Sequence, residues 1–382
     1  MNKLVHDQLG IILSLVSVSD QPWAVCKAWH RLVRSRPDVM ACILANSTAR
    51  PIFLLVRKGP VHNTLVLDRL LELPRSSLDE DLSFACCEAI RRGFQDTVHK
   101  LLSSGLVSAD CDEGPGLFAA DDDGGSGLII AASNRRLEIV RLLLEWPLNA
   151  PRADSRDGRA LIVAVKTGNA DMVRLLLEWP VDAPRADSRD GRALIVAVKT
   201  GNADMVRLLL GWPLNAPRAD CRGGQALLVA AEDGDVDMVR LLLGWPVNAA
   251  RADCQNGIAL ESAARNGHAD VVRNLLGWPV NAARADCRDG QSLIDAAENG
   301  HDNTIRQLLE WPVNAPRADC KDGEALMVAV RNKHHHTVRL LLGWPQNAPR
   351  ADCRDGEALM VAVRNKHHHT VRLLLGWPQN AP

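Results

Sequence analysis

The sequence has little aromatic variety and no surplus of either charge. Its 382 residues contain no tyrosine and only four phenylalanines, while 45 basic residues nearly balance 46 acidic ones. Balanced charge argues against nucleic acid as the main partner, because binding to phosphates needs a basic surplus. No hydrophobic run approaches the roughly 20 residues that cross a bilayer. We therefore expect no nucleic-acid partner and no membrane span.

Tryptophan is the exception, and its positions reveal a repeat. Eight of the ten tryptophans are followed by proline and lie 33 residues apart, at Trp146, Trp179, Trp212, Trp245, Trp278, Trp311, Trp344 and Trp377. Glycines keep the same spacing from Gly125 to Gly356. Such close copying is typical of a linear stack of like units, a solenoid, rather than of one globular core.

The pattern within each unit predicts two short helices and a long loop, so the fold class is all-α. In one copy, an apolar helix over 160–166 is followed by Asn169, which offers a capping oxygen to a second helix over 172–178. Trp179-Pro180 ends the second helix, because proline disfavours helical geometry in the residue before it. The stretch 181–191 is rich in Pro, Asp, Arg and Gly, which predicts a projecting turn.

These units resemble the ankyrin repeat. The resemblance rests on Asp157-Gly158 before the first helix, on the segment GNADMVRLLL over 168–177, and on Val247-Asn248-Ala249 in a later unit. The family's T-P-L-H turn is replaced by Arg159-Ala160-Leu161-Ile162, so the hydrogen bonds usual in that turn cannot form. The resemblance implies a helix-turn-helix solenoid of about eight regular repeats over 125–382, with protein binding as its function.

Before residue 125 the pattern becomes irregular. Phe84 to Gly93, followed by Thr97 to Leu102, has the same two-helix outline, and Pro51 to Leu73 has it more faintly. We interpret 48–124 as one or two degenerate ankyrin-like units with an acidic loop insertion. End units of solenoids are expected to be atypical, because one of their faces does not meet another repeat.

Residues 1–47 follow no 33-residue pattern and resemble an F-box, because a hydrophobic stripe precedes V-C-x-x-W-x-x-L and a basic run. The resemblance implies docking into a Skp-type adaptor of a cullin-RING ubiquitin ligase, while the repeats hold the substrate. Val5 stands where the family usually has proline, and Pro22 interrupts an expected helix. The positions that carry over as adaptor-facing or fold-defining are Leu4, Leu9, Ile12, Leu13, Val25, Cys26, Trp29 and Leu32.

Two other interpretations of this segment stay open. In the first interpretation the segment is a plain helical cap on the first repeat, and the protein is a scaffold with no ubiquitin role. The other is a secretory signal with Lys3 as the charged region and 9–18 as the apolar core. Asp7 and the number of cysteines argue against export.

The cysteines and histidines do not predict a metal site. Neighbouring repeats stack about 10 Å apart, too far for equivalent cysteines to form a disulfide or to share zinc. We expect free thiols in a reducing compartment, the cytoplasm or also the nucleus. The triplet over 334–336, repeated over 367–369, is interpreted as a solvated helix start rather than a metal site between repeats, and His268 and His301 as structural. The cysteines in question share one repeat position: Cys221, Cys254, Cys287, Cys320 and Cys353.

No nucleophile-base set and no phosphate-binding glycine loop is present, so we predict a protein that is not an enzyme and holds no cofactor. Binding of a partner protein is expected on the concave face formed by the turns and first helices. The residue after the repeat glycine varies and runs from cationic to anionic along the array, with neutral drift on a solvated turn as the alternative. This predicted row comprises Arg159, Arg192, Gln225, Ile258, Gln291, Glu324 and Glu357.

The tryptophan row allows two interpretations. It is either buried against the next unit's helix end or an exposed aromatic stripe that meets a partner. We expect burial, because exposed rows of tryptophan invite aggregation.

Overall fold

The computed structural model describes residues 67, 71, 79–108, 126–148 and 150–377. Within these ranges the regular elements are α-helices, which confirms the predicted all-α solenoid. The chain divides into two compact units, residues 1–184 and 185–382, and each is described by itself. Residues 1–47, with the predicted adaptor-facing positions, lie outside the described residues, as does the acidic loop insertion. The predicted domain boundaries therefore stay predictions.

Unit 1 contains three helix pairs in its described part, and its first helices α6, α8 and α10 pack on one another in order. The pair α6 and α7 coincides with the two-helix outline expected upstream of the regular repeats. The bounds are α6 Asp79–Arg92 and α7 Gln95–Ser103, α8 Gly127–Ser133 and α9 Leu137–Leu144, and α10 Ser155–Lys166 and α11 Ala170–Leu177.

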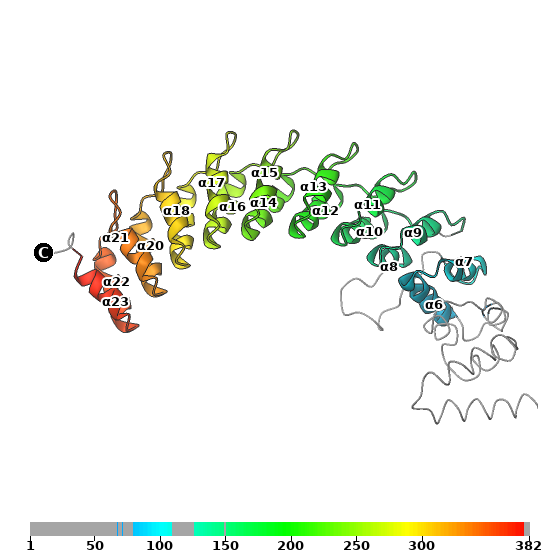
Figure 1. The fold of residues 1–382 in the computed structure, drawn as a ribbon, viewed down its shortest axis with the longest axis horizontal. Helices are drawn as coiled ribbons and strands as arrows, with labels where there is room; N and C mark the ends of the chain where they lie inside the picture. The colour runs from blue at the N-terminus through cyan, green and yellow to red at the C-terminus, as the bar shows by residue number, and fades with distance from the viewer. Residues whose placement is uncertain (1–66, 68–70, 72–78, 109–125, 149, 378–382) are drawn as a thin grey trace, which may run out of the picture. The chain divides into compact units, whose positions relative to one another are not determined.

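Unit 2 contains six helix pairs that follow one another side by side (Figure 1). Its first helices pack on the first helices of the adjacent pairs, and most of its second helices likewise pack on their neighbours. The bounds are α12 Ser188–Lys199 and α13 Ala203–Leu210, α14 Cys221–Asp233 and α15 Val236–Leu243, α16 Cys254–Arg265 and α17 Ala269–Gly277, α18 Cys287–Glu298 and α19 Asp302–Leu309, α20 Cys320–Arg331 and α21 His335–Leu342, and α22 Cys353–Arg364 and α23 His368–Leu375.

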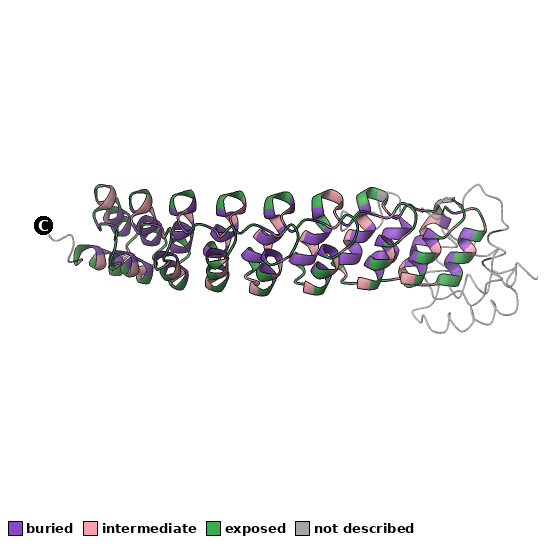
Figure 2. Cartoon of the chain, turned by 90° about the horizontal axis from the view of Figure 1, so that it is seen from above, coloured by how far each residue is buried: buried purple, intermediate pink, exposed green. Residues whose placement is uncertain are grey.

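The second helices form where capping and apolar spacing predict them. The side chain of Asn202 accepts a hydrogen bond from the backbone N–H of Met205 at 2.9 Å, which satisfies one unpaired donor at the helix start. Met205, Val206, Leu209 and Leu210 are buried on one side of α13. Figure 2 shows the same division, with buried residues on the sides of the helices that face one another and exposed residues outside.

Each first helix from α10 to α22 opens with a left-handed turn. In α16 the residues Gln255, Asn256 and Gly257 have φ values of 48°, 57° and 85°, so regular helix begins only after the glycine, as the sequence predicts. Gly257 also lies against the next repeat, because a β-carbon built on it would be 2.5 Å from Cys287 Sγ. Glycine is therefore required here for two reasons, a positive φ and a close neighbour.

Local contacts shape the long loop of each repeat. Asn248 has a φ of 52°, which asparagine tolerates better than most residues. Further along the same loop, the Arg251 guanidinium donates two hydrogen bonds of 2.9 Å to the Asp253 carboxylate, on either side of the buried Ala252. The same arginine–aspartate pair closes the other loops of unit 2, which gives these recurring residues a structural role.

The tryptophans of unit 2 lie differently from the expectation. They are only partly buried, and four of them lie beside the helix end of the preceding repeat: Trp245, Trp278, Trp311 and Trp377. A β-carbon at Gly211 would be 3.8 Å from Trp245, and one at Gly244 would be 3.7 Å from Trp278. The expected full burial is not found. Gly211 and Gly244 carry no side chain, so they leave the ends of their helices open to the indole of the following repeat.

Candidate protein-binding surface

The first helices of unit 2 leave one side uncovered by the second helices. The first, fourth, fifth and eighth residues after the repeat glycine share this side, as helical periodicity requires. We call these positions on α12, α14, α16, α18, α20 and α22 the first-helix face. On α12 they are Arg192, Ile195, Val196 and Lys199, all of them exposed or partly exposed. On α12 the face thus has an apolar centre between polar edges.

The predicted row lies along one edge of this face. In unit 2 its end members Arg192 and Glu357 are exposed, and the four residues between them are partly exposed. Arg159 holds the equivalent position on α10 in unit 1 and is also partly exposed. The structure therefore leaves the row accessible within each unit.

Two members of the row are engaged by the following repeat. The Lys321 ammonium donates to Gln291 Oε1 at 2.7 Å, and Arg354 pairs with Glu324. Arg354 also donates to the carbonyl oxygen of Lys321 at 2.9 Å. Glu324 is therefore partly neutralised within the array, which the sequence did not indicate.

Two buried carboxylates interrupt the apolar centre of the face. Glu261 on α16 is 4% exposed and Asp295 on α18 is 3% exposed. Arg288 donates to Glu261 Oε2 at 2.9 Å, and Arg265 donates to Asp295 Oδ2 at 2.7 Å. Each repeat thus supplies one carboxylate and one arginine, and the two ion pairs cross between the repeats.

The environment of Glu261 is unfavourable for its charge. Burial raises the pKa of the Glu261 carboxyl, against the opposing effect of the Arg288 guanidinium, and the Asp295 carboxylate raises it further. Glu261 Oε1 is buried without a hydrogen-bond partner. The sequence analysis missed this pair, although α14 carries Leu228 and Val229 at the two equivalent positions. That apolar-to-acidic change between copies was the available signal.

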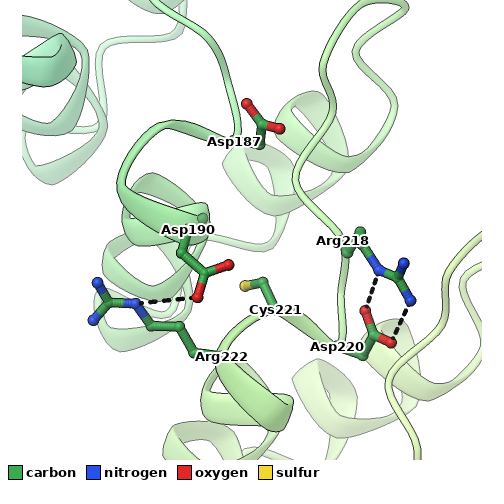
Figure 3. A pocket seen from close by; sticks show the side chains of 7 residues that line it. Asp187, Asp190, Arg218, Asp220, Cys221 and Arg222 are labelled. Carbon is green, nitrogen blue, oxygen red and sulfur yellow. Dashed lines mark hydrogen bonds and ion pairs between the residues drawn. The ribbon is translucent and has the colours of Figure 1, made fainter.

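A cavity of about 340 Å³ lies beside the turns that precede α12 and α14. Its lining includes Cys221, between the Asp190–Arg222 pair and the Arg218–Asp220 pair (Figure 3). Arg218 binds both carboxylate oxygens of Asp220, at 2.7 and 2.8 Å, and this holds the pKa of that carboxyl below its ordinary value. The charged groups of the cavity thus largely satisfy one another.

The cysteines of the repeat position are free thiols, as predicted. Burial raises the pKa of Cys221, Cys254, Cys320 and Cys353 to about 11 and also raises that of Cys287. A thiol with such a pKa stays protonated near neutral pH and is a poor nucleophile. These cysteines pack against the neighbouring repeat and offer no activated sulfur.

The single histidines link adjacent repeats. A ring nitrogen of His268 lies 3.0 Å from the carbonyl oxygen of Glu232, and one of His301 lies 2.9 Å from that of Arg265. Their predicted structural role is confirmed. In the triplets, the rings of His335 and His369 lie edge to face with centroids 5.0 Å apart.

Neither a metal cluster nor a membrane span is found among the residues that the structure describes. In these residues no group of three or more His, Cys, Asp or Glu side chains could hold a metal ion. The described helices are also too short or too polar to cross a bilayer. The interpretation of the histidine triplets as solvated helix starts stays a prediction.

Comparison with known families agrees with this architecture. The family model for ankyrin repeats (3 copies) matches residues 82–189, 148–220, 194–289 and 293–381. The chain belongs to the ankyrin-repeat family. A search of curated proteins gave no match. The ankyrin match begins inside the segment interpreted as degenerate units, and ankyrin repeats function in protein–protein interaction.

Proposed function

We propose that this ankyrin array recognises a partner protein on its first-helix face and has no catalytic role. One observation carries the proposal: the accessible first position of the face varies between repeats, while the two residues after it are Ala-Leu in every first helix of unit 2 except α18, which has Ser292-Leu293. Arg192 is followed by the buried pair Ala193-Leu194, and Ile258 by the buried pair Ala259-Leu260. Packing therefore fixes the buried positions, and the accessible ones are free to fit a partner.

The order of charges along the row supports a partner that carries the opposite charges in the same order. Within unit 2 it begins with exposed Arg192 and ends with exposed Glu357, although Glu324 is partly neutralised by Arg354. A partner that offers acidic groups near Arg192 and basic groups near Glu357 fits this order. Complementary charge mainly sets specificity and association rate.

Charge reversal tests this proposal. We expect the double variant Arg159→Glu and Arg192→Glu to lose roughly tenfold in affinity for a captured partner. The matched control is Arg174→Glu with Arg207→Glu, because these arginines are 54% and 56% exposed but lie on the second helices. Equal binding by the wild type and the first variant would remove the row from the recognition surface.

The finer form of the proposal is an F-box-type substrate receptor of a cullin-RING ubiquitin ligase. The V-C-x-x-W-x-x-L pattern near the N-terminus supports it. The alternative is an ankyrin scaffold whose N-terminus only caps the repeats. The free thiols support a reducing compartment, the cytoplasm or nucleus.

A pull-down with a Skp-type adaptor separates the two forms. We expect the wild type to retain the adaptor and the variant Ile12→Ala with Trp29→Ala to lose it. The charge-reversal variant of the repeats should retain the adaptor and thus serves as the control. If the wild type does not retain the adaptor, the receptor form of the proposal is wrong and the scaffold form remains.

A further inference from the structure

The last two helix pairs of unit 2 carry a surface of exposed cationic and histidine side chains. It comprises the turns that precede α21 and α23 and the exposed side of these two second helices. The sequence around it is poor in acids, because no Asp or Glu occurs over 325–351 or 358–382. We call the following residues, all of them exposed, the basic patch: Lys333, His336, Arg339, Lys366, His369 and Arg372.

The arginines of the basic patch lack the aspartate that pairs with the equivalent arginine of other repeats. Arg207 on α13 binds Asp204 at 3.0 Å, and the same pair recurs on α17. In α21 and α23 a histidine replaces this aspartate, and these are the second helices of unit 2 that have no acidic residue in the first turn. Arg339 and Arg372 therefore have no side-chain partner among the described residues. Arg306 on α19 has none there either, but its helix keeps an aspartate in the first turn.

The lysines of the basic patch occupy a backbone position that favours glycine. Lys333 and Lys366 have φ values of 66° and 58°, and the other four repeats of unit 2 carry glycine here. A positive φ is unfavourable for residues with a β-carbon. A β-carbon at Gly300 would be 2.6 Å from His334, and after Lys333 the equivalent His367 turns Nδ1 rather than Nε2 toward a carbonyl oxygen. The array thus keeps lysines where packing favours glycine, and such strain is typical of functional positions.

Histidine contacts join the two halves of the basic patch. On α21 the ring centroids of His335 and His336 are 4.4 Å apart, and that of His335 also lies 5.0 Å from the ring of His369 on α23. The first turns of the two helices therefore lie side by side, and the patch residues of one repeat continue into those of the next. The basic patch is one surface that spans two adjacent repeats.

Acidic groups of the preceding repeat mark the limit of the basic patch. Asp302 on α19 accepts a hydrogen bond from Thr337 Oγ1 at 2.6 Å. Glu298 at the end of α18 is exposed, and its carbonyl oxygen lies 2.9 Å from a ring nitrogen of His334. A partner of the patch therefore meets positive charge over α21 and α23 and negative charge on the α19 side.

We propose that the basic patch binds an acidic segment of a partner protein. Its two lysines and two arginines offer positive charge, and the arginines lack a partner among the described residues. Carboxylate-rich peptides and nucleic acids both match this charge. The observations favour a peptide, because the patch has no Trp, Tyr or Phe on which a base could stack and because ankyrin repeats function in protein–protein interaction. The patch lies on the second helices, so this proposal and the one for the first-helix face can fail separately.

Fluorescence anisotropy with the full chain tests the basic patch. The probe is a labelled peptide that alternates Glu and Ser over about 12 residues, and a Lys-Ser peptide of the same length is its control. We expect the Glu-Ser peptide to bind at roughly 100 µM or tighter in low salt, and to bind at least about fivefold more weakly at an ionic strength of roughly 0.3 M. The Lys-Ser peptide should not bind.

A first double variant fills the position that aspartate occupies in other repeats. His336→Asp with His369→Asp should weaken binding of the Glu-Ser peptide roughly tenfold, because each new aspartate pairs with a patch arginine. The fold accepts aspartate here, since α13 carries the Asp204–Arg207 pair at the same position. A loss of binding therefore reports the charge of the patch rather than misfolding.

A second double variant removes the lysines, and a matched control removes arginines that are paired. Lys333→Gly with Lys366→Gly should weaken peptide binding roughly fivefold, although glycine relieves the positive φ. The control is Arg207→Ala with Arg273→Ala, because these arginines hold the same helix position as the patch arginines but are bound to aspartates. It should bind the peptide as the wild type does.

Single-stranded and duplex DNA of about 12 nucleotides are the competing probes. Tighter binding of either DNA than of the Glu-Ser peptide would overturn the assignment to a protein segment. The proposal is also wrong if the wild type does not bind this peptide, if either patch variant binds it as the wild type does, or if the control loses it. Arg159→Glu with Arg192→Glu should keep the peptide, and its loss there would place the peptide on the first-helix face instead.

Discussion

At the scale of single residues, glycines and cysteines from adjacent repeats fit together along unit 2. The Sγ atom of Cys287 fills the space that a β-carbon at Gly257 would need, and Cys254 does the same for Gly224. Ser188 stands at the equivalent position in an earlier repeat. The position therefore selects a small side chain that fits against glycine, rather than sulfur chemistry.

Two glycines at the same repeat position separate backbone strain from contact. Gly257→Ala should cost roughly 1–2 kcal/mol for its positive φ and about 1–3 kcal/mol more for overpacking against Cys287. Gly356→Ala should cost only the backbone part, because nothing lies within 4 Å of its β-carbon position although its φ is +80°. Denaturant unfolding measures both. Cys287→Ala should recover part of the Gly257→Ala loss, and equal losses at the two glycines would contradict the contact.

The raised pKa of the repeat thiols predicts their reactivity. At pH 8 we expect Cys221, Cys254, Cys320 and Cys353 to be alkylated slowly in the folded protein, with the rate rising only toward their pKa of about 11. Unfolded thiols ionise near pH 8.5. The unfolded state therefore loses these protons first, and the free energy of unfolding falls as pH rises from about 8.5 to 11. Peptide mapping after alkylation measures each thiol, with the urea-unfolded chain as the control.

At the scale of helices, the crossed ion pairs between α16 and α18 replace apolar packing. Replacing a buried ion pair with hydrophobic residues is often neutral or stabilising, whereas removing one partner is costly. Arg288→Ala should therefore cost about 1–3 kcal/mol, because it leaves the Glu261 carboxylate without its hydrogen-bond donor. Adding Glu261→Leu, the residue that α14 carries, should restore stability.

The pH dependence of the Glu261→Leu variant has a definite sign. The folded pKa of Glu261 is raised above the ordinary value near 4.3, so the folded state binds more protons than the unfolded state as pH rises. Below pH 4.3 the Glu261 carboxyl is protonated in both states, so the cost of burying its charge is absent. We expect Glu261→Leu to raise the thermal midpoint more at pH 7 than at pH 4. A larger gain at pH 4 would contradict the raised pKa.

The positions of the helices could be predicted from the sequence, whereas the contacts between repeats could be predicted only in part. Asn202 and Trp212-Pro213 mark the start and end of α13, because caps and prolines act within one turn of chain. Which side Trp245 covers depends on Gly211, 34 residues earlier, so periodicity alone did not reveal it. The accessible row was predicted, but the partners of Glu324 and Gln291 come from neighbouring repeats.

At the scale of the whole array, each repeat is stabilised mainly by its neighbours. The contribution of a residue to stability therefore depends on its place in the stack. Met327 and Met360 occupy the same repeat position on α20 and α22. Met327 is fully buried beside α22, whereas Met360 is 69% exposed because no described helix pair packs on the far side of α22. Identical side chains thus have different surroundings.

This pair of methionines gives a direct measurement of neighbour coupling in unit 2. Met327→Ala should destabilise unit 2 by about 2–5 kcal/mol, because it opens a cavity between repeats. Met360→Ala should change stability by less than about 0.5 kcal/mol. Hydrogen exchange should show faster opening of α20 and α22 in the first variant and unchanged rates in the second. Equal effects would mean that Met360 is covered in solution, and cross-linking of the α22 surface would then locate the covering segment.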